Sequence, residues 1–166
     1  MIEEIKKIID THEYVIDDWL INQIDNEFKK GSYSSRANCN ALALEITLKA
    51  AGKLKTLDKV EGESYQWRHD WAYDENHLID LKCRPIWSNN YSVSVNKESV
   101  ELGQVTHVIG FKQNIVLNDY VPHRGKTLKF TCEGMIPVED VEKYGRDQGG
   151  WYLLDKKYLQ LPQSVL

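Results

Sequence analysis

The chain has little cysteine and no long apolar run. Its three cysteines, Cys39, Cys83 and Cys132, are widely spaced and form no C-x-x-C pair. The sequence therefore indicates neither a disulfide framework nor a zinc site, and we expect a reducing cytoplasm. No apolar stretch approaches the ~20 residues needed to cross a bilayer. The first residues, Met-Ile-Glu-Glu-Ile-Lys-Lys, lack the apolar core of a signal peptide. These absences argue against a secreted scaffold and against a membrane protein.

An excess of positive charge is also missing, because the formal net charge is −4. Nucleic-acid-binding proteins usually have a basic surface, since neutralising phosphates supplies much of their affinity. An enzyme that holds its substrate through metal ions can nevertheless be acidic overall and basic only along a cleft. Basic residues that could line such a cleft are Lys49, Lys53, Lys55, Arg84 and the run His123–Lys126. Net charge alone therefore leaves a nucleic-acid substrate open.

What is present is typical of one globular domain. The chain has 166 residues, of which 42% are hydrophobic and 28% charged, which is enough to bury a core. We expect a helical segment over residues 1–35, packed on an α/β domain over residues 36–166. The first segment is predicted to hold a helix over 1–9 and a second helix that starts at Asp10 or Thr11. A third helix is predicted from Arg36 to Ala51, with Gly52 as its C′ residue.

Alternating apolar and polar residues dominate after residue 60. Strands are predicted near residues 63–73, 78–84, 92–95, 106–112, 128–136 and 158–161, with a short helix over 137–145. No repeat, low-complexity tract or linker divides the chain. The predicted fold class is α/β (α+β), with a mixed sheet of about five strands flanked by helices.

The most informative stretch runs from Asp70 to Lys82. Asp70 and Asp80 lie ten residues apart on the two sides of a turn predicted at Asp74-Glu75-Asn76, and Lys82 follows two residues later. Residues i and i+2 of a strand share one face, so Asp80 and Lys82 should project together, and the partner strand should return Asp70 beside them. Two carboxylates and an ammonium at one sheet edge can hold a divalent cation and a phosphate together. This pattern favours nuclease chemistry.

The motif Asp70…Asp80-Leu81-Lys82 resembles the signature of the PD-(D/E)xK, or restriction-endonuclease-like, nuclease superfamily. Glu45, in the predicted third helix, matches the glutamate that many members add. The resemblance covers most of the chain, with His69 in place of the proline that precedes the first aspartate. It implies a restriction-endonuclease-like core, Mg²⁺ (or Mn²⁺) as cofactor, and the backbone carbonyl of Leu81 as a further ligand. It also implies a small phage-type enzyme in the host cytoplasm, with homodimers frequent among members.

Each of these residues also has a plainer interpretation. Asp70 and Asp80 could be solvated strand residues, although aspartate is depleted from strands such as Ile79-Asp80-Leu81. Lys82 could form an ordinary ion pair with either aspartate. Glu45 could pair with Lys49 one helical turn away, and Glu61 or Glu63 could replace it in the site. The histidines and tryptophans beside the motif could contact the substrate or simply pack: His69, His77, Trp67, Trp71 and Trp87.

The sequence thus predicts a magnesium-dependent endonuclease acting on nucleic acid, with DNA favoured. In this hypothesis Asp70, Asp80, Glu45 and the Leu81 carbonyl bind the metal, and Lys82 stabilises charge on the phosphate. Two alternatives stay open. The first is the same fold with a retired site, which binds nucleic acid or a protein, for example in phage–host conflict. The second is an assembly protein in which the D-x-K pattern is accidental.

Overall fold

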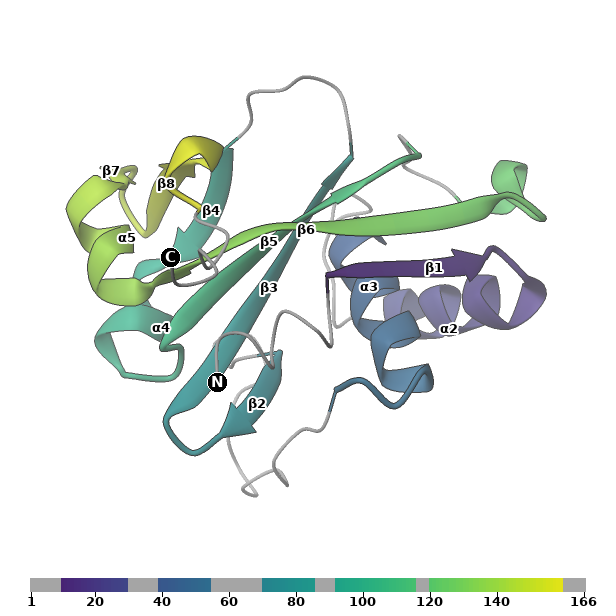
Figure 1. The fold of residues 1–166 in the computed structure, drawn as a ribbon, viewed down its shortest axis with the longest axis horizontal. Helices are drawn as coiled ribbons and strands as arrows, with labels where there is room; N and C mark the ends of the chain where they lie inside the picture. The colour runs from purple at the N-terminus through teal and green to yellow at the C-terminus, as the bar shows by residue number, and fades with distance from the viewer. Residues whose placement is uncertain (1–9, 30–38, 55–69, 86–91, 116–119, 160–166) are drawn as a thin grey trace, which may run out of the picture.

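The computed structural model describes residues 10–29, 39–54, 70–85, 92–115 and 120–159. Its centre is a five-stranded mixed sheet in the order β1-β6-β5-β3-β2 (Figure 1). The strands are β1 (Thr11–Val15), β2 (Trp71–Asp74), β3 (His77–Pro85), β5 (His107–Gln113) and β6 (Thr127–Pro137). Only β3 and β5 are parallel; the other three neighbouring pairs of this sheet are antiparallel.

Two helices cover one face of this sheet, α2 (Asp18–Lys29) and α3 (Cys39–Ala50). The Asp17 carboxylate accepts a hydrogen bond from the Leu20 backbone N–H at 2.9 Å, which fixes the start of α2. Apolar residues of both helices pack against alternate residues of the strands, which forms the larger core. This core includes Leu20, Ile24, Leu44, Leu48, Ile79, Leu81, Ile109, Phe111 and Phe130.

A smaller layer covers part of the opposite face. It consists of a three-stranded sheet in the order β4-β8-β7, with β4 (Ser92–Asn96), β7 (Arg146–Asp147) and β8 (Trp151–Asp155). The helices α4 (Lys97–Glu101) and α5 (Val138–Tyr144) and the 3₁₀ turn η4 (Lys156–Tyr158) belong to the same layer; a second 3₁₀ turn, η3 (Val121–His123), precedes β6. A second core joins Val108 and Ile136 of the large sheet to Val95, Val141 and Leu154. Figure 1 shows this layer on one side of the molecule and the α2–α3 pair on the other.

The mixed sheet and the flanking helices confirm the coarse prediction. The strands predicted near 78–84, 92–95, 106–112 and 128–136 are present within one or two residues, and so is the short helix after Pro137. The third helix ends at Ala50, and Gly52 has a positive φ of 69°, as predicted for C′. The division at residue 35 falls outside the described residues and stays a prediction.

Two predicted elements are wrong. Residues 11–15 form a strand rather than the start of a helix, because they alternate in burial and pair with β6, so Asp17 and not Asp10 begins the helix. No strand begins at Tyr158, which lies in η4. The last strand among the described residues is β8, which begins seven residues earlier and pairs with β4. Helix α4 was not predicted; the Asn96 side chain caps it by accepting from the Ser99 N–H at 3.0 Å.

Candidate active site

A tight hairpin sets the position of the motif. The turn Glu75-Asn76 joins β2 to β3, and the Asp74 carboxylate accepts a hydrogen bond from the Asn76 N–H at 2.8 Å. The pairing of Trp71 with Ile79 continues as a hydrogen bond of 2.9 Å from the Asp70 N–H to the Ile79 carbonyl. This hydrogen bond holds Asp70 at the end of the hairpin. The charge of Asp80 acts on the pKa of Asp70, so the two predicted carboxylates lie near each other.

Asp70 lies just before β2, where the pairing with β3 ends. Its Oδ2 accepts a hydrogen bond from the Leu81 backbone N–H at 2.8 Å, so the carboxylate takes the place of a missing strand partner. Burial raises the pKa of Asp70 well above its usual value, and the negative charges of Asp80 and Glu45 raise it further. The Lys82 ammonium and the hydrogen bond from Leu81 oppose these effects. All four predicted side chains therefore share one electrostatic environment.

Asp80 and Lys82 project from the same face of β3. The Lys82 Nζ lies 3.0 Å from the Asp80 Oδ2, and these side chains are 25% and 16% exposed. Ile79 precedes Asp80 and Leu81 lies between Asp80 and Lys82. Both point into the larger core and are 0% and 2% exposed. The predicted alternation is confirmed. The charges of Asp80 and Lys82 both act on the pKa of Asp70, so the three charged groups lie near one another.

Glu45 reaches this region from α3, which packs on the opposite face of β3. Its side chain is 19% exposed and forms the ion pair with Lys49, at 2.5 Å, that was the plainer interpretation of this residue. Its charge nevertheless raises the pKa of Asp70. Glu45 is thus close enough to influence the aspartates and is at the same time held by a lysine of its own helix.

The donor set can be tested against the preferences of magnesium. Among the described residues, no three His, Cys, Asp or Glu side chains are grouped as a ready-made metal cage. Mg²⁺ does not require one, since it usually takes one or two carboxylates and completes its shell with water and substrate phosphate. Asp70 and Asp80 supply two carboxylates that lie near each other, and one oxygen of Asp70 also accepts a hydrogen bond from the Leu81 N–H. The residues present therefore fit Mg²⁺.

The structure also settles several plainer alternatives. Trp71 is 2% exposed within the larger core, so it packs rather than stacks on a base. Cys83 is buried as expected, and burial raises the pKa of its thiol. His77 contacts Asp74 at 2.6 Å and stacks on His107 with ring centroids 5.3 Å apart. Glu61, Glu63, Trp67, His69 and Trp87 lie outside the described residues.

The sequence indicated Arg84 as a cleft residue but not the lysines that continue this face, Lys112 and Lys156. Arg84 is exposed one step beyond Lys82, and it pairs in register with Lys112 of β5. Glu133 of β6 lies 3.9 Å from the Lys112 Nζ and 3.1 Å from the Lys156 Nζ. These lysines come from segments far apart in the sequence, so only strand pairing reveals that they are neighbours.

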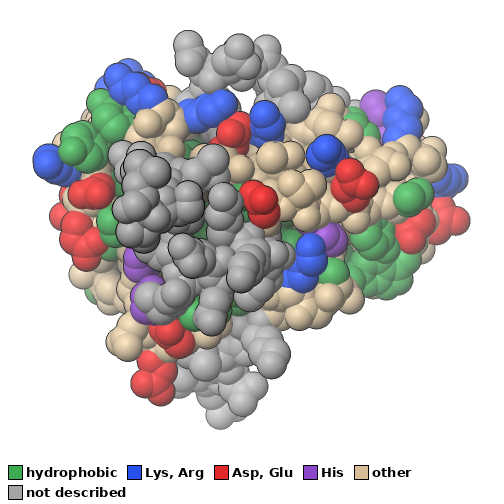
Figure 2. All heavy atoms as spheres, viewed as in Figure 1, with side chains coloured by type: hydrophobic (Ala, Val, Ile, Leu, Met, Phe, Trp, Pro, Cys, Tyr) green, Lys and Arg blue, Asp and Glu red, His purple; other side chains and the backbone are tan. Residues whose placement is uncertain are grey.

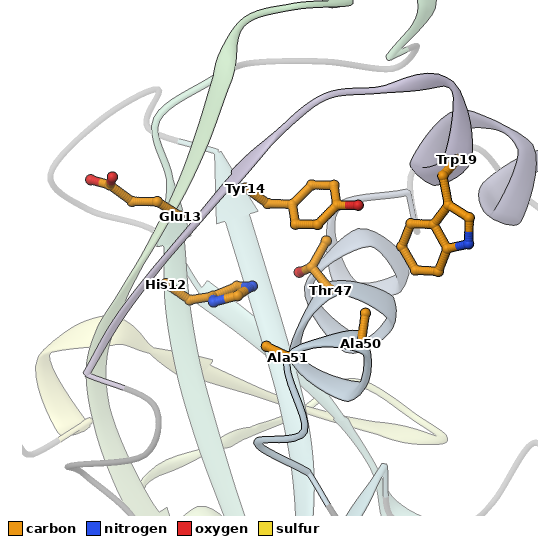
Figure 3. A pocket seen from close by; sticks show the side chains of 7 residues that line it. All are labelled: His12, Glu13, Tyr14, Trp19, Thr47, Ala50 and Ala51. Atoms are coloured by element: carbon orange, nitrogen blue, oxygen red, sulfur yellow. The ribbon is translucent and has the colours of Figure 1, made fainter.

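A hollow of about 380 Å³ lies away from the motif, between β1 and the end of α3 (Figure 3). Tyr14, Trp19 and Thr47 face it, whereas Glu13 points away. The ring of His12 is 6% exposed and stacks on Phe130 with centroids 6.2 Å apart. No predicted site residue lines this hollow.

Within the part of the chain that the structure describes, no helix is long and apolar enough to cross a membrane. Comparison of the chain with family models, with curated proteins and with solved structures finds no match.

Proposed function

We propose that this chain is a magnesium-dependent endonuclease that hydrolyses phosphodiester bonds in DNA. The observation that carries the proposal is that Asp70, Asp80 and Lys82 lie near one another at the β2–β3 hairpin. Burial raises the pKa of Asp70, and the negative charges of Asp80 and Glu45 raise it further. Such a cluster is unfavourable alone and becomes favourable when a cation binds.

Asp70 and Asp80 would hold the ion, together with the backbone carbonyl of Leu81. Glu45 would assist from the α3 side, either directly or through water. A bound Mg²⁺ polarises the phosphoryl oxygens and lowers the pKa of a bound water. This chemistry is what a carboxylate pair without a nucleophilic side chain needs.

Lys82 would supply the positive charge that contacts the substrate phosphate. Its ammonium is held beside Asp80 and is one-quarter exposed, so it can contact a phosphate without leaving its partner. In that position it stabilises the negative charge that develops on the phosphoryl oxygens. The nucleophile in this proposal is water, and no covalent enzyme intermediate forms.

The order of the elements supports the restriction-endonuclease-like assignment. A helix carrying an acid, α3, precedes the β2–β3 hairpin that carries the motif. Helix α4 then lies on the connection to β5, which returns parallel to β3 as its neighbour. Helices α2 and α3 lie on one face and the α4–α5 layer on the other, as expected for a covered parallel pair.

The test is cleavage of supercoiled plasmid and of single-stranded DNA in magnesium, manganese or chelator. Asp80→Ala and Lys82→Ala are each expected to lose about 100-fold or more of a metal-dependent activity. Two matched controls should retain it: Asp74→Ala, in the same hairpin but at its turn, and Lys129→Ala, an exposed strand lysine. Absence of cleavage, or cleavage that survives both motif variants, would refute the proposal.

A second candidate is a nuclease fold with a retired site that binds nucleic acid or a protein. The ion pair between Glu45 and Lys49 and the net charge of −4 favour it. Calorimetric titration with Mg²⁺ and Mn²⁺ distinguishes the two candidates. A retired site would show no heat of metal binding that Asp80→Asn removes.

A further inference from the structure

Two tyrosines stack on each other on the smaller layer, one exposed and one half-buried against the smaller core. Tyr144 ends α5 and Tyr158 ends η4, and their rings are nearly parallel, 10° apart, with centroids separated by 4.7 Å. Tyr144 is 42% exposed. Figure 2 shows hydrophobic side chains with Lys and Arg side chains beside them at the corner where Figure 1 places β7, β8 and η4.

A lysine lies over each ring of this tyrosine pair. The Lys143 Nζ is 5.0 Å from the centroid of Tyr144, and the Lys157 Nζ is 5.0 Å from the centroid of Tyr158. Lys143 lies in the last turn of α5, whereas the acids Glu139 and Asp140 lie in its first turn. Aromatic faces with cations beside them are the components of sequence-tolerant binding sites for single-stranded nucleic acid.

Basic residues connect the tyrosine pair to the motif. Lys156, next to Lys157, lies 3.1 Å from Glu133, and the same carboxylate lies 3.9 Å from Lys112. Lys112 pairs in register with Arg84, which shares its face of β3 with Lys82. A strand two residues long rises about 6.6 Å, so Lys82 and Arg84 can contact successive phosphates of one nucleic-acid strand.

We propose that Tyr144 and Tyr158 are a stacking platform for a base of single-stranded DNA, whose backbone follows Lys156, Lys112 and Arg84 to Asp80. This inference rests on the proposed function. The occupant is single-stranded because a paired base within a duplex does not offer its face to a protein ring. Base stacking on tyrosine contributes more than an exposed cation–π contact, so a base can displace Lys143 from the ring. The displaced ammonium then gains a phosphate partner.

The test is fluorescence anisotropy of a labelled single-stranded oligonucleotide bound to the full chain in chelator, where metal-dependent cleavage cannot occur. Tyr144→Ala is expected to weaken binding about 5- to 100-fold. Tyr144→Phe keeps the ring and should stay within about twofold of wild type. Trp19→Ala is the matched control, because Trp19 is also 42% exposed but lies on α2, and it should leave binding unchanged.

Salt dependence supplies a second readout. Lys143→Gln and Lys157→Gln should each reduce the slope of log affinity against log salt by about 0.7, the value for one phosphate contact on a single strand. Duplex of the same sequence should be nearly insensitive to Tyr144→Ala. These charge variants keep the inference testable should Tyr144→Ala lose its fold, which circular dichroism would reveal.

The outcomes separate this inference from the proposed function. Cleavage that requires Asp80, combined with single-strand binding that ignores Tyr144→Ala, overturns the platform and leaves the nuclease. Binding that requires Tyr144 in a chain without cleavage supports the platform and removes the nuclease. An equal loss of duplex and single-strand binding in Tyr144→Ala overturns the platform as a base-stacking surface.

Discussion

Replacing Asp70 with asparagine should make the metal-free protein more stable. Burial disfavours the charged form of this carboxyl, and the negative charges of Asp80 and Glu45 disfavour it further. Asparagine keeps an oxygen that can accept the hydrogen bond from the Leu81 N–H, at present 2.8 Å long. The substitution therefore removes the repulsion and retains most of the geometry.

The magnitude follows from Coulomb's law. Two carboxylates about 5–6 Å apart repel each other by about 3 kcal/mol at an effective dielectric constant of ~20. The hydrogen bond from Leu81 weakens by about 1 kcal/mol when its acceptor loses its charge, and the attraction of Lys82 is also lost. We expect a net gain of about 1 kcal/mol, or roughly 2–4 °C in Tm for a chain of this size.

The pH dependence carries the sign of the effect. A carboxyl whose pKa is raised by folding binds its proton more readily in the folded state. It therefore lowers the stability of the fold when the pH rises above 3.8, its ordinary pKa, and the full loss is reached above the folded-state pKa. The advantage of Asp70→Asn should therefore be largest near pH 7 and should shrink as the pH falls toward 4. Urea denaturation in chelator across this range measures it.

Asp74→Asn is the control, because it should behave in the opposite way. The hydrogen bond with His77 lowers the pKa of Asp74, so its contribution stabilises the fold above pH 3.8 and disappears as the pH falls through the folded pKa. Magnesium should raise the Tm of wild type but not that of Asp70→Asn. A destabilised Asp70→Asn at pH 7, or an advantage that grows on acidification, would refute the reasoning.

Three further predictions test the rest of the structure. Burial lowers the pKa of His12, with a smaller effect from Lys53, so the free energy of unfolding should fall as the pH drops below 6.5. Denaturation of wild type and His12→Phe between pH 7 and pH 5 should show a smaller fall in the variant. Cys83 is buried, which raises the pKa of its thiol, so it should not react with iodoacetamide in the native protein and should react in urea. Peptide mapping measures this, and modification under native conditions would contradict the burial of Cys83. Ile79 is fully buried beneath the motif, so Ile79→Val should lower the free energy of unfolding by about 0.5–1.5 kcal/mol and Ile79→Ala by about 2–5 kcal/mol. Urea denaturation measures both values, and equally small losses would argue against a place for Ile79 in the core.

The hairpin could be predicted from sequence because its signals are local. Ile79, Leu81 and Cys83 alternate with Asp80 and Lys82, and a strand with one apolar face fixes which side chains project together. The turn residues Asp74 to Asn76 then fix the return of Asp70. Each of these signals lies within a dozen residues, so no knowledge of the tertiary fold was needed.

The elements that were wrong depend on distant partners. Thr11–Val15 is a strand because it pairs with Thr127–Thr131, more than a hundred residues later, and its own pattern suits a helix equally well. β8 likewise owes its place to β4. The role of Glu45 was undecided for a related reason, since the rotation of α3 against β3 determines whether a helical acid faces the sheet edge or its neighbour Lys49.

The net charge of −4 is a poor guide to the partner of this chain, because attraction to a phosphate depends on local charge. Along the path from the motif to the tyrosine pair lie six cations, Lys82, Arg84, Lys112, Lys156, Lys157 and Lys143. Lys82 pairs with Asp80, and Lys112 and Lys156 both lie near Glu133. Electrostatic attraction within a Debye length of ~8 Å senses this local excess rather than the total. In this proposal the acids at the motif do not repel DNA because a bound divalent cation would neutralise the two aspartates. Lys82 and Arg84 lie on the same strand face as Asp80. Magnesium should therefore strengthen the binding of DNA to wild type and leave the binding of DNA to Asp80→Asn unchanged. DNA binding that magnesium does not strengthen in wild type would contradict this account.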